Sequence, residues 1–208
     1  MPEAIKIKID NVRLSYCNVH VAQANKLAPE KPATFSTDGI LPMDHPQLPE
    51  VKAAIRKVAQ SMWGDNADAI LKDLADEGRI AIKKGDKKRN KDGSPVEAYA
   101  GKLYIKAANK TRPLVLDANK AILTEKDGRP YSGCWGNLIV TIKGLTGTGP
   151  MAQAGKRIYA ELNGVQFTRH DTSFGGGSTP SSVDEFSVVG ADADATPPNN
   201  AGGAADFM

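Results

Sequence analysis

A strict alternation of apolar and polar residues near the start of the chain limits what it can fold into. Ile5, Ile7 and Ile9 lie on one side of residues 4–10, and charged or polar residues lie on the other. A period of two is that of a β-strand with one buried face. The alternation continues less regularly through Tyr16 to about residue 21. Further strands, separated by Gly, Asn and Pro, are expected at residues 79–84, 96–108, 112–117, 134–143 and 157–168.

A different period interrupts this mainly β chain in its first half. From Leu48 to Met62, apolar residues recur every three or four positions, which is the pattern of an amphipathic helix. Gly64 suits the end of this helix, and a second, shorter helix is expected to end at Gly78. The sequence therefore predicts a small antiparallel barrel or sandwich with a helical pair inserted at about residues 48–77.

The formal net charge of +3 conceals two unequal parts of the chain. Residues 171–208 contain six acidic residues and no Lys or Arg, so they carry −6, whereas residues 1–170 carry +9. Such asymmetry is typical of a nucleic-acid-binding body with an acidic tail. Small residues of low hydrophobicity predominate after Phe174, and they predict a disordered tail over residues 175–208. The folded domain is expected to span residues 1–174.

Several classes of protein and site are disfavoured. The first ten residues lack the apolar core of a signal peptide, and no apolar run approaches the ~18 residues of a membrane helix, so a cytoplasmic protein is expected. Cys17 and Cys134 are most simply reduced thiols, although a bridge between them stays open. No recognisable metal or catalytic-triad spacing involves the three histidines, His20, His45 and His170. We therefore expect no enzymatic activity, no metal and no cofactor.

A basic segment at residues 79–93, RIAIKKGDKKRNKDG, is the most informative part of the sequence. It holds seven basic residues against Asp86 and Asp92, and Gly next to each aspartate signals a turn. The charge is therefore expected on a loop or hairpin tip. Such a loop is either a solvated surface or a site for phosphate groups, for which the candidates are Lys83, Lys84, Lys87, Lys88, Arg89 and Lys91.

Two strand candidates place aromatic and basic side chains on the face opposite to their apolar residues. In GKLYIKA, residues 101–107, the outward set is Lys102, Tyr104 and Lys106. In YSGCWGNLIVTIK, residues 131–143, it includes Tyr131, Trp135 and Lys143. Aromatic rings that stack on bases, beside ammonium groups that neutralise phosphates, are what single-stranded nucleic acid requires. Arg112 is added to the phosphate-neutralising candidates.

Each aromatic residue also has a structural interpretation. Tyr104 could instead cover a sheet edge under the helical pair, and Trp135 could belong to the core, where most tryptophans are buried. Tyr99 has the parity of the inward face and is expected to pack inside. Two strands with aromatic and lysine side chains, next to a basic loop, favour nucleic-acid binding more than any single residue does.

Four segments carry a resemblance to a known family. They are EAIKIKIDNVRLSY at residues 3–16, GRPYSGCWGNLIVTIKG at 128–144, GKRIYAELNGVQFTRHDTSFGGG at 155–177, and the acidic tail ending in DFM. Together they resemble the single-stranded DNA-binding proteins of tailed bacteriophages. The resemblance spans most of residues 1–186 and is weakest over the helical pair.

That family implies an OB-fold, a five-stranded barrel whose open face holds single-stranded DNA in phage replication, recombination or repair. It also implies action in the host-cell cytoplasm and a flexible tail that contacts replication proteins and competes with DNA. The tail residues in question are Asp192, Asp194, Asp206 and Phe207. Two alternatives stay open: an RNA-binding or strand-annealing protein, and an interaction module whose basic loop binds an acidic protein. Whether the chain forms a homodimer is also open.

Overall fold

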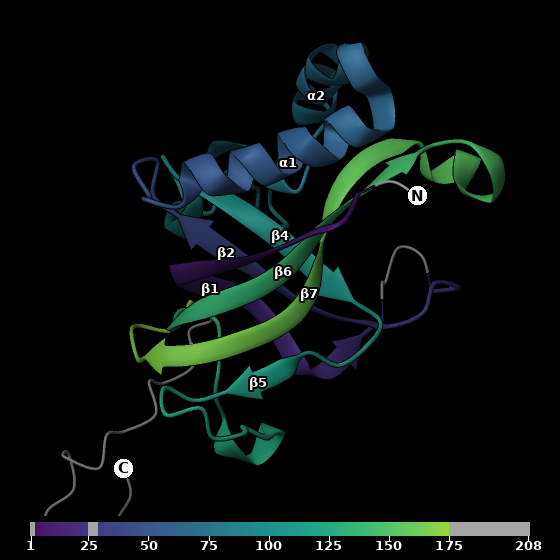
Figure 1. The fold of residues 1–208 in the computed structure, drawn as a ribbon. Coiled ribbons are helices and arrows are strands. Elements are labelled where there is room, and N and C mark those ends of the chain that lie inside the picture. Colours follow the sequence, from purple (N-terminus) through teal and green to yellow (C-terminus); the bar gives the residue numbers. More distant parts are fainter. Residues whose placement is uncertain (1–2, 25–28, 175–208) are drawn as a thin grey trace, which may run out of the picture. The chain divides into compact units, whose positions relative to one another are not determined.

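Strands outnumber helices in the part of the chain that the computed structural model describes, residues 3–24 and 29–174 (Figure 1). The chain divides into two units, residues 1–177 and 178–208, and all described residues belong to the first. The predicted tail, residues 175–208, lies outside them. The strands are β1 (Ile5–Gln23), β2 (Thr34–Leu41), β3 (Ile82–Lys84), β4 (Leu103–Asn109), β5 (Leu114–Leu116), β6 (Trp135–Thr146) and β7 (Lys156–Arg169).

Five of these strands close into a barrel. Its ring runs β1–β2–β4–β7–β6 and returns to β1, while β3 extends the edge of β4 and β5 that of β7. Four of the neighbouring pairs are antiparallel. The closing pair is parallel and short, with Ala107 opposite Ala160 and Ala108 opposite Glu161. The predicted five-stranded OB-fold is therefore confirmed, except that it is closed by one parallel pair instead of being antiparallel throughout.

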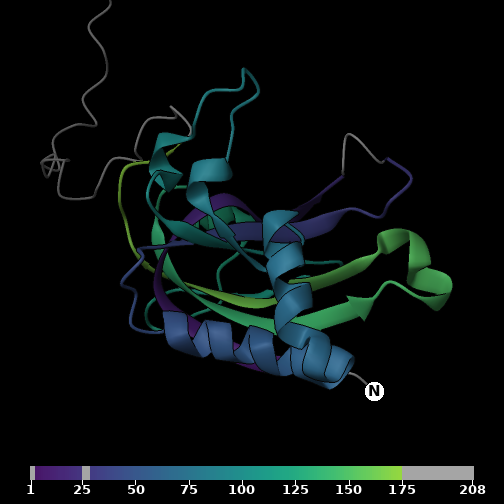
Figure 2. The ribbon, with the colours of Figure 1, turned by 90° about the horizontal axis from the view of Figure 1, so that it is seen from above.

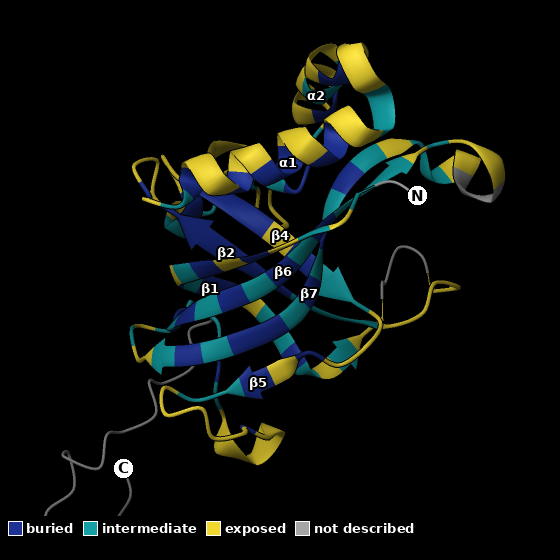
Figure 3. Ribbon diagram, in the orientation of Figure 1, coloured by how far each residue is buried: buried dark blue, intermediate teal, exposed yellow. Residues whose placement is uncertain are grey.

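The barrel interior is filled by the side chains that the alternation assigned to it. Ile7 and Ile9 of β1 are buried against Leu138 and Val140 of β6 and Leu162 of β7. Figure 3 shows the corresponding bands of buried and partly exposed residues along β6 and β7. Because successive side chains of a strand point to opposite faces, burial of one face leaves the other available for binding.

The helical pair consists of α1 (Leu48–Trp63) and α2 (Ala67–Asp76), joined by a single turn, Gly64–Asn66. Helix α1 lies along the barrel next to β6 (Figure 2). It ends at Gly64, whose positive φ of 53° suits a residue without a side chain. A Cβ atom at Gly144 of β6 would lie 2.1 Å from Sδ of Met62, so glycine at this position lets the Met62 side chain pack directly on the strand. In the described ranges, no helix is both long and apolar enough to span a bilayer.

Two parts of the predicted strand pattern are wrong. Strand β2 lies in the proline-containing stretch, where the sequence predicted no strand. The alternation that marks a strand is missing there because the last five residues of β2 are all buried. The strand expected at 96–108 is divided into a turn, Glu97–Tyr99, and β4. The strand expected at 79–84 is present only as β3, because residues 80–81 bend. The segment lies between two strands: the N–H of Lys106 in β4 donates to Ala81 O, and that of Ile158 in β7 donates to Arg79 O.

Candidate nucleic-acid interface

The two strands that carry the aromatic and basic candidates, β4 and β6, are not neighbours in the barrel. In the ring, β7 separates β4 from β6 on one side, and β2 and β1 separate them on the other. Their outer faces therefore point to different sides of the barrel. The candidate residues divide into a group around β3 and β4 and a group at β6.

Lys88 anchors the basic loop to the barrel. Its Nζ atom lies 2.8 Å from Oδ2 of Asp38, a buried carboxylate that also accepts a hydrogen bond of 2.9 Å from the Tyr99 hydroxyl. The same Nζ lies 4.4 Å from the ring centre of Tyr16 and 5.0 Å from that of Tyr104. The charge of Lys88 is therefore paired within the protein. Contrary to prediction, it is not available as a free phosphate contact.

Tyr104 faces outward as predicted but is not exposed. Only 7 % of its surface is accessible, because the turn that contains Tyr99 covers it. The Tyr104 and Tyr99 rings meet edge to face with centres 5.0 Å apart. Burial raises the pKa of Tyr104 to about 12. The prediction of an exposed Tyr104 is wrong, whereas Tyr99 is fully buried, which confirms its predicted packing role.

Tyr16 is the exposed aromatic residue that the sequence did not reveal. A register shift in the β1–β2 pair between Ser15 and Asn18, together with a φ of 48° at Tyr16, turns this side chain outward. Its side chain is 48 % exposed, and its ring centre lies 6.5 Å from that of Tyr99. We call Tyr16, Tyr99 and Tyr104 the tyrosine row. A non-glycine residue with positive φ is uncommon, so no local signal predicts this reversal.

A hollow of about 250 Å³ continues from the tyrosine row toward the start of β6. Tyr16 and Tyr99 form one part of its lining, and Ser132 and Phe174 form another. The ring of Phe174 in turn lies 4.7 Å from the guanidinium of Arg13. Side chains thus connect the β4 group with the β6 group around this side of the barrel, although the two strands do not adjoin.

Trp135 is half-buried and is held by charged neighbours. The guanidinium of Arg169 lies 4.4 Å from its ring centre and that of Arg13 lies 5.8 Å away. Its Nε1–H donates a hydrogen bond of 2.7 Å to Asp171, which also pairs with Arg13 at 3.1 Å. Trp135 is therefore neither the fully buried core residue of one interpretation nor the freely exposed ring of the other.

Three further candidates are occupied by protein partners. The Tyr131 hydroxyl donates a hydrogen bond of 2.9 Å to the backbone oxygen of Asp171. Lys143 forms an ion pair of 2.6 Å with Glu161, and the hydrogen bond between them raises the pKa of Lys143. Arg112 lies 3.4 Å from Nδ1 of His20. These contacts leave the β6 group with less free positive charge than predicted.

The predicted hairpin tip, by contrast, does present free charge. Residues 88–96 form a hairpin in which the N–H of Val96 donates to Lys88 O and that of Asn90 to Ser94 O. No carboxylate of the described ranges forms an ion pair with the exposed cations here, which are Lys84, Lys87, Arg89, Lys91 and Lys102. Three of them do donate to backbone oxygens. Their charges remain uncompensated next to the tyrosine row.

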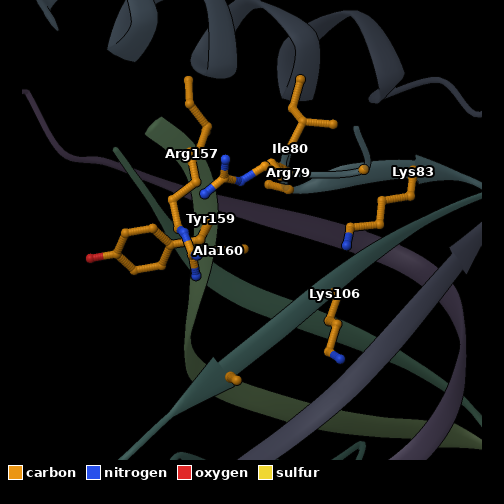
Figure 4. Close-up of a pocket in the computed structure, with 11 residues that line it drawn as sticks. Arg79, Ile80, Lys83, Lys106, Arg157, Tyr159 and Ala160 are labelled. Carbon is orange, nitrogen blue, oxygen red and sulfur yellow. The ribbon is translucent and has the colours of Figure 1, made fainter. Parts of the chain in front are cut away.

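A second concentration of positive charge surrounds a pocket of about 420 Å³ where β4 meets β7. Lys83 and Lys106 line it as predicted cations, and the structure adds Arg79, Arg157 and Tyr159 (Figure 4). Burial, followed by the charge of Lys106, lowers the pKa of Lys83. The sequence did not group these residues, because they come from distant segments that only barrel closure brings together.

The sequence matches the family described as "Enterobacter phage Enc34, ssDNA-binding protein" over residues 5–196. This chain belongs to that family. A relative from Acyrthosiphon pisum secondary endosymbiont phage 1, "Putative protein p50", is 35% identical over 185 residues, which are 88% of this chain and 92% of the relative. The predicted resemblance is thus confirmed, and the family is described as one of single-stranded DNA-binding proteins.

Solved structures of phage proteins share the fold of this family member. The single-stranded DNA-binding protein from bacteriophage Enc34 superimposes with a TM-score of 0.62 at 22% identity, over 87% of this chain and 90% of that one. The structure of the same protein in complex with ssDNA superimposes with a TM-score of 0.61 at 23% identity, over 82% of this chain and 89% of that one. The gp2.5 protein of bacteriophage T7, also a single-stranded DNA-binding protein, superimposes with a TM-score of 0.52 at 12% identity, over 97% of this chain and 100% of that one.

The structure also shows the state of the two cysteines and the arrangement of the residue types that could bind a metal. Cys17 and Cys134 are both free thiols, so the bridge that the sequence left open is not formed. Burial raises the pKa of Cys134 to about 11. Within the part of the chain that is described, no three His, Cys, Asp or Glu side chains gather in a way that could hold a metal ion.

Proposed function

We propose that this chain binds single-stranded DNA without reading its sequence and that it acts in phage DNA replication, recombination or repair in the host cytoplasm. Membership of the Enc34 family supports single-stranded DNA as the ligand. The observation that carries the site is the hairpin of residues 88–96, whose Asn90 and Val96 line the same hollow as the exposed ring of Tyr16 and which carries the exposed Arg89 and Lys91. Phosphates contact Lys84, Lys87, Arg89, Lys91 and Lys102, and a base stacks on Tyr16.

Such a surface binds single-stranded DNA with little dependence on the base sequence. Each base stacked on an aromatic ring contributes roughly 1–3 kcal/mol, and every base offers a flat face. Each phosphate neutralised on a single strand adds about 0.7 to the slope of log K against log salt. The ring of Tyr99 packs against that of Tyr16, and Tyr104 packs against Tyr99 in turn, while Lys88 fixes the loop by its ion pair with Asp38.

The test is a fluorescence anisotropy titration of labelled oligo-dT at two salt concentrations. Tyr16→Ala removes the exposed ring and should weaken binding by about 5- to 100-fold, the equivalent of one stacked base. Ile122→Ala is the matched control, because Ile122 is 73% exposed but lies outside the tyrosine row and the basic loop. Equal affinities of the two variants would remove Tyr16 from the site.

Competitors in the same titration separate the alternatives. Unlabelled duplex DNA should compete poorly, because paired bases cannot stack on a protein ring. RNA that competes as well as oligo-dT would favour an RNA-binding or strand-annealing protein. No binding of oligo-dT at low salt would contradict the proposal and favour an acidic protein as the partner of the basic loop.

The acidic tail is given two roles in this proposal. Its carboxylates compete with DNA for the basic surface, and its end recruits phage or host replication proteins. Asp192, Asp194, Asp206 and Phe207 carry these roles and lie outside the described residues. The charge of the tail opposes that of the body, which supports competition between the tail and DNA.

A further inference from the structure

The pocket between β4 and β7 has an unusual lining. Arg79, Lys83, Lys106 and Arg157 contribute four positive charges, and none of the residues that line it is Asp or Glu. The four side chains come from the segment before β3, from β3, from β4 and from β7. Figure 4 shows the two arginines on one side and the two lysines on the other. A hollow with only positive charges at its wall is a site for an anion.

The two arginines are held in place by the backbone of the β6–β7 connection. Nη2 of Arg79 and Nη2 of Arg157 both donate to the carbonyl oxygen of Ala154, at 2.5 Å and 2.6 Å. The next residue, Gly155, leaves room for this arrangement, because a Cβ atom there would lie 2.2 Å from Nη2 of Arg79. Both guanidinium groups are thus positioned before any ligand arrives, which reduces the entropy cost of binding.

Hydrogen-bonding capacity is left over in this arrangement. Each guanidinium has five N–H donors, and the contact with Ala154 uses one of them. Among the described residues, the buried Nε of Arg157 has no hydrogen-bond partner. Arg79 also lies 3.4 Å from Glu77, a contact on its exposed side. A planar guanidinium with free donors matches an oxygen-rich anion such as phosphate, with which it forms paired hydrogen bonds.

We propose that this arginine–lysine pocket binds a phosphate group, and that the phosphate belongs to the backbone of single-stranded DNA. The choice of DNA as its source rests on the function proposed above. It is supported by continuity, because Lys83 of the pocket lies opposite Tyr104 of the tyrosine row in the β3–β4 pair. A DNA strand with a base on Tyr16, the exposed ring of the row, would cross the edge of β4 to reach the pocket. A free polyphosphate has the same chemistry and is the other source to be tested.

The test compares a double variant with a matched control. Lys83→Gln with Lys106→Gln removes two pocket charges and leaves the arginines and Ala154 untouched. Lys120→Gln with Lys126→Gln removes two exposed charges outside the pocket, the basic loop and the tyrosine row. Lys106→Gln alone is the second pocket variant, because this exposed side chain can be replaced without disturbing the fold.

Two measurements are made on the full chain. In the first, inorganic pyrophosphate should raise the melting temperature of the wild type and of the control, but not that of the pocket variant. In the second, the slope of log K against log salt for oligo-dT should fall by about 0.7–1.4 in the pocket variant, as expected for one or two lost phosphate contacts. The control should keep the wild-type slope if its two lysines do not touch DNA.

The outcomes separate the pocket from the proposed function. Loss of the pyrophosphate effect with an unchanged slope would support a phosphate site but overturn DNA as its source. Pocket and control variants that agree in both measurements, while oligo-dT still binds, would overturn the pocket and leave the proposed function intact. A wild type that does not bind oligo-dT would overturn the proposed function, and the pyrophosphate measurement would still decide whether the pocket takes phosphate.

Discussion

Asp171 links the side chain of Trp135, at the start of β6, with that of Arg13 in β1. Its carboxylate accepts a hydrogen bond from Nε1 of Trp135 at 2.7 Å and pairs with Arg13 at 3.1 Å. The hydrogen bond from the indole, followed by that from the Thr172 backbone, holds the pKa of Asp171 below its usual range. A carboxyl group with a lower pKa in the folded protein stabilises the fold above its unfolded pKa. This contribution disappears as the pH falls through the folded pKa.

Asp171→Asn should therefore lower the free energy of unfolding at pH 7 but not at acid pH. The loss at pH 7 should be about 1 kcal/mol or less, because the carboxylate is a partly exposed ion-pair member. The difference from wild type should shrink as the pH falls below about 4 and on through the lower pKa of the folded carboxyl group, which becomes neutral only there. Urea unfolding at pH 7 and pH 3 measures this, with the exposed Asp44→Asn as control. A difference that does not change with pH would contradict the assignment.

The packing of helix α1 against strand β6 depends on one small residue, Gly144. Gly144 lies under Met62 and Val58 of α1, and a Cβ atom there would come within 2.1 Å of Met62 Sδ. The φ of Gly144 is not positive, so alanine strains no backbone angle and acts only by crowding the helix. The contact joins the helical pair to the barrel, away from the tyrosine row.

Gly144→Ala should destabilise the protein by about 1 kcal/mol, the lower end of the cost of overpacking, because the side chain of Met62 is flexible and partly exposed and can move aside. Met62→Ala removes the obstructing side chain, so Gly144→Ala should cost clearly less in that background. Urea unfolding of the four proteins in this double-mutant cycle gives the coupling. The same cost in both backgrounds would show that Met62 is not the residue that requires glycine at 144.

On the scale of the whole chain, opposite charges are divided between body and tail. Residues 175–208 contain five acidic and no basic residues. Attraction between exposed charges is screened over about 10 Å at 0.1 M salt. A tail that competes with DNA must therefore act most strongly when the salt concentration is low.

Deletion of residues 175–208 should accordingly tighten the binding of oligo-dT at low salt, and the gain should diminish as salt is added. A full-length chain with its five tail carboxylates replaced by Asn or Gln is the control for length, and it should behave like the truncated chain. Anisotropy titrations of the three proteins measure the effect. Unchanged or weaker binding by the truncated chain would contradict competition by the tail.

Periodicity alone predicts much of this fold. The alternation at Ile5–Ile9 and Leu138–Ile142 and the helical spacing from Leu48 arise because each element buries one face, and this is a local property of the sequence. Strand β2 escapes prediction because its last five residues are all buried and so show no alternation. Tyr16 escapes it because a bulge reverses the side chain, and no residue type marks that position.

The binding surface could be predicted only as a set of residue types. Aromatic and basic residues are visible along the chain, but the order of strands in a closed ring decides which of them meet. That order separates β4 from β6, pairs Lys88 with Asp38 and Lys143 with Glu161, and gathers Arg79, Lys83, Lys106 and Arg157 around one pocket. Contacts between residues about 80 positions apart, such as Arg79 and the start of β7, form only when the barrel closes, so no local pattern records them.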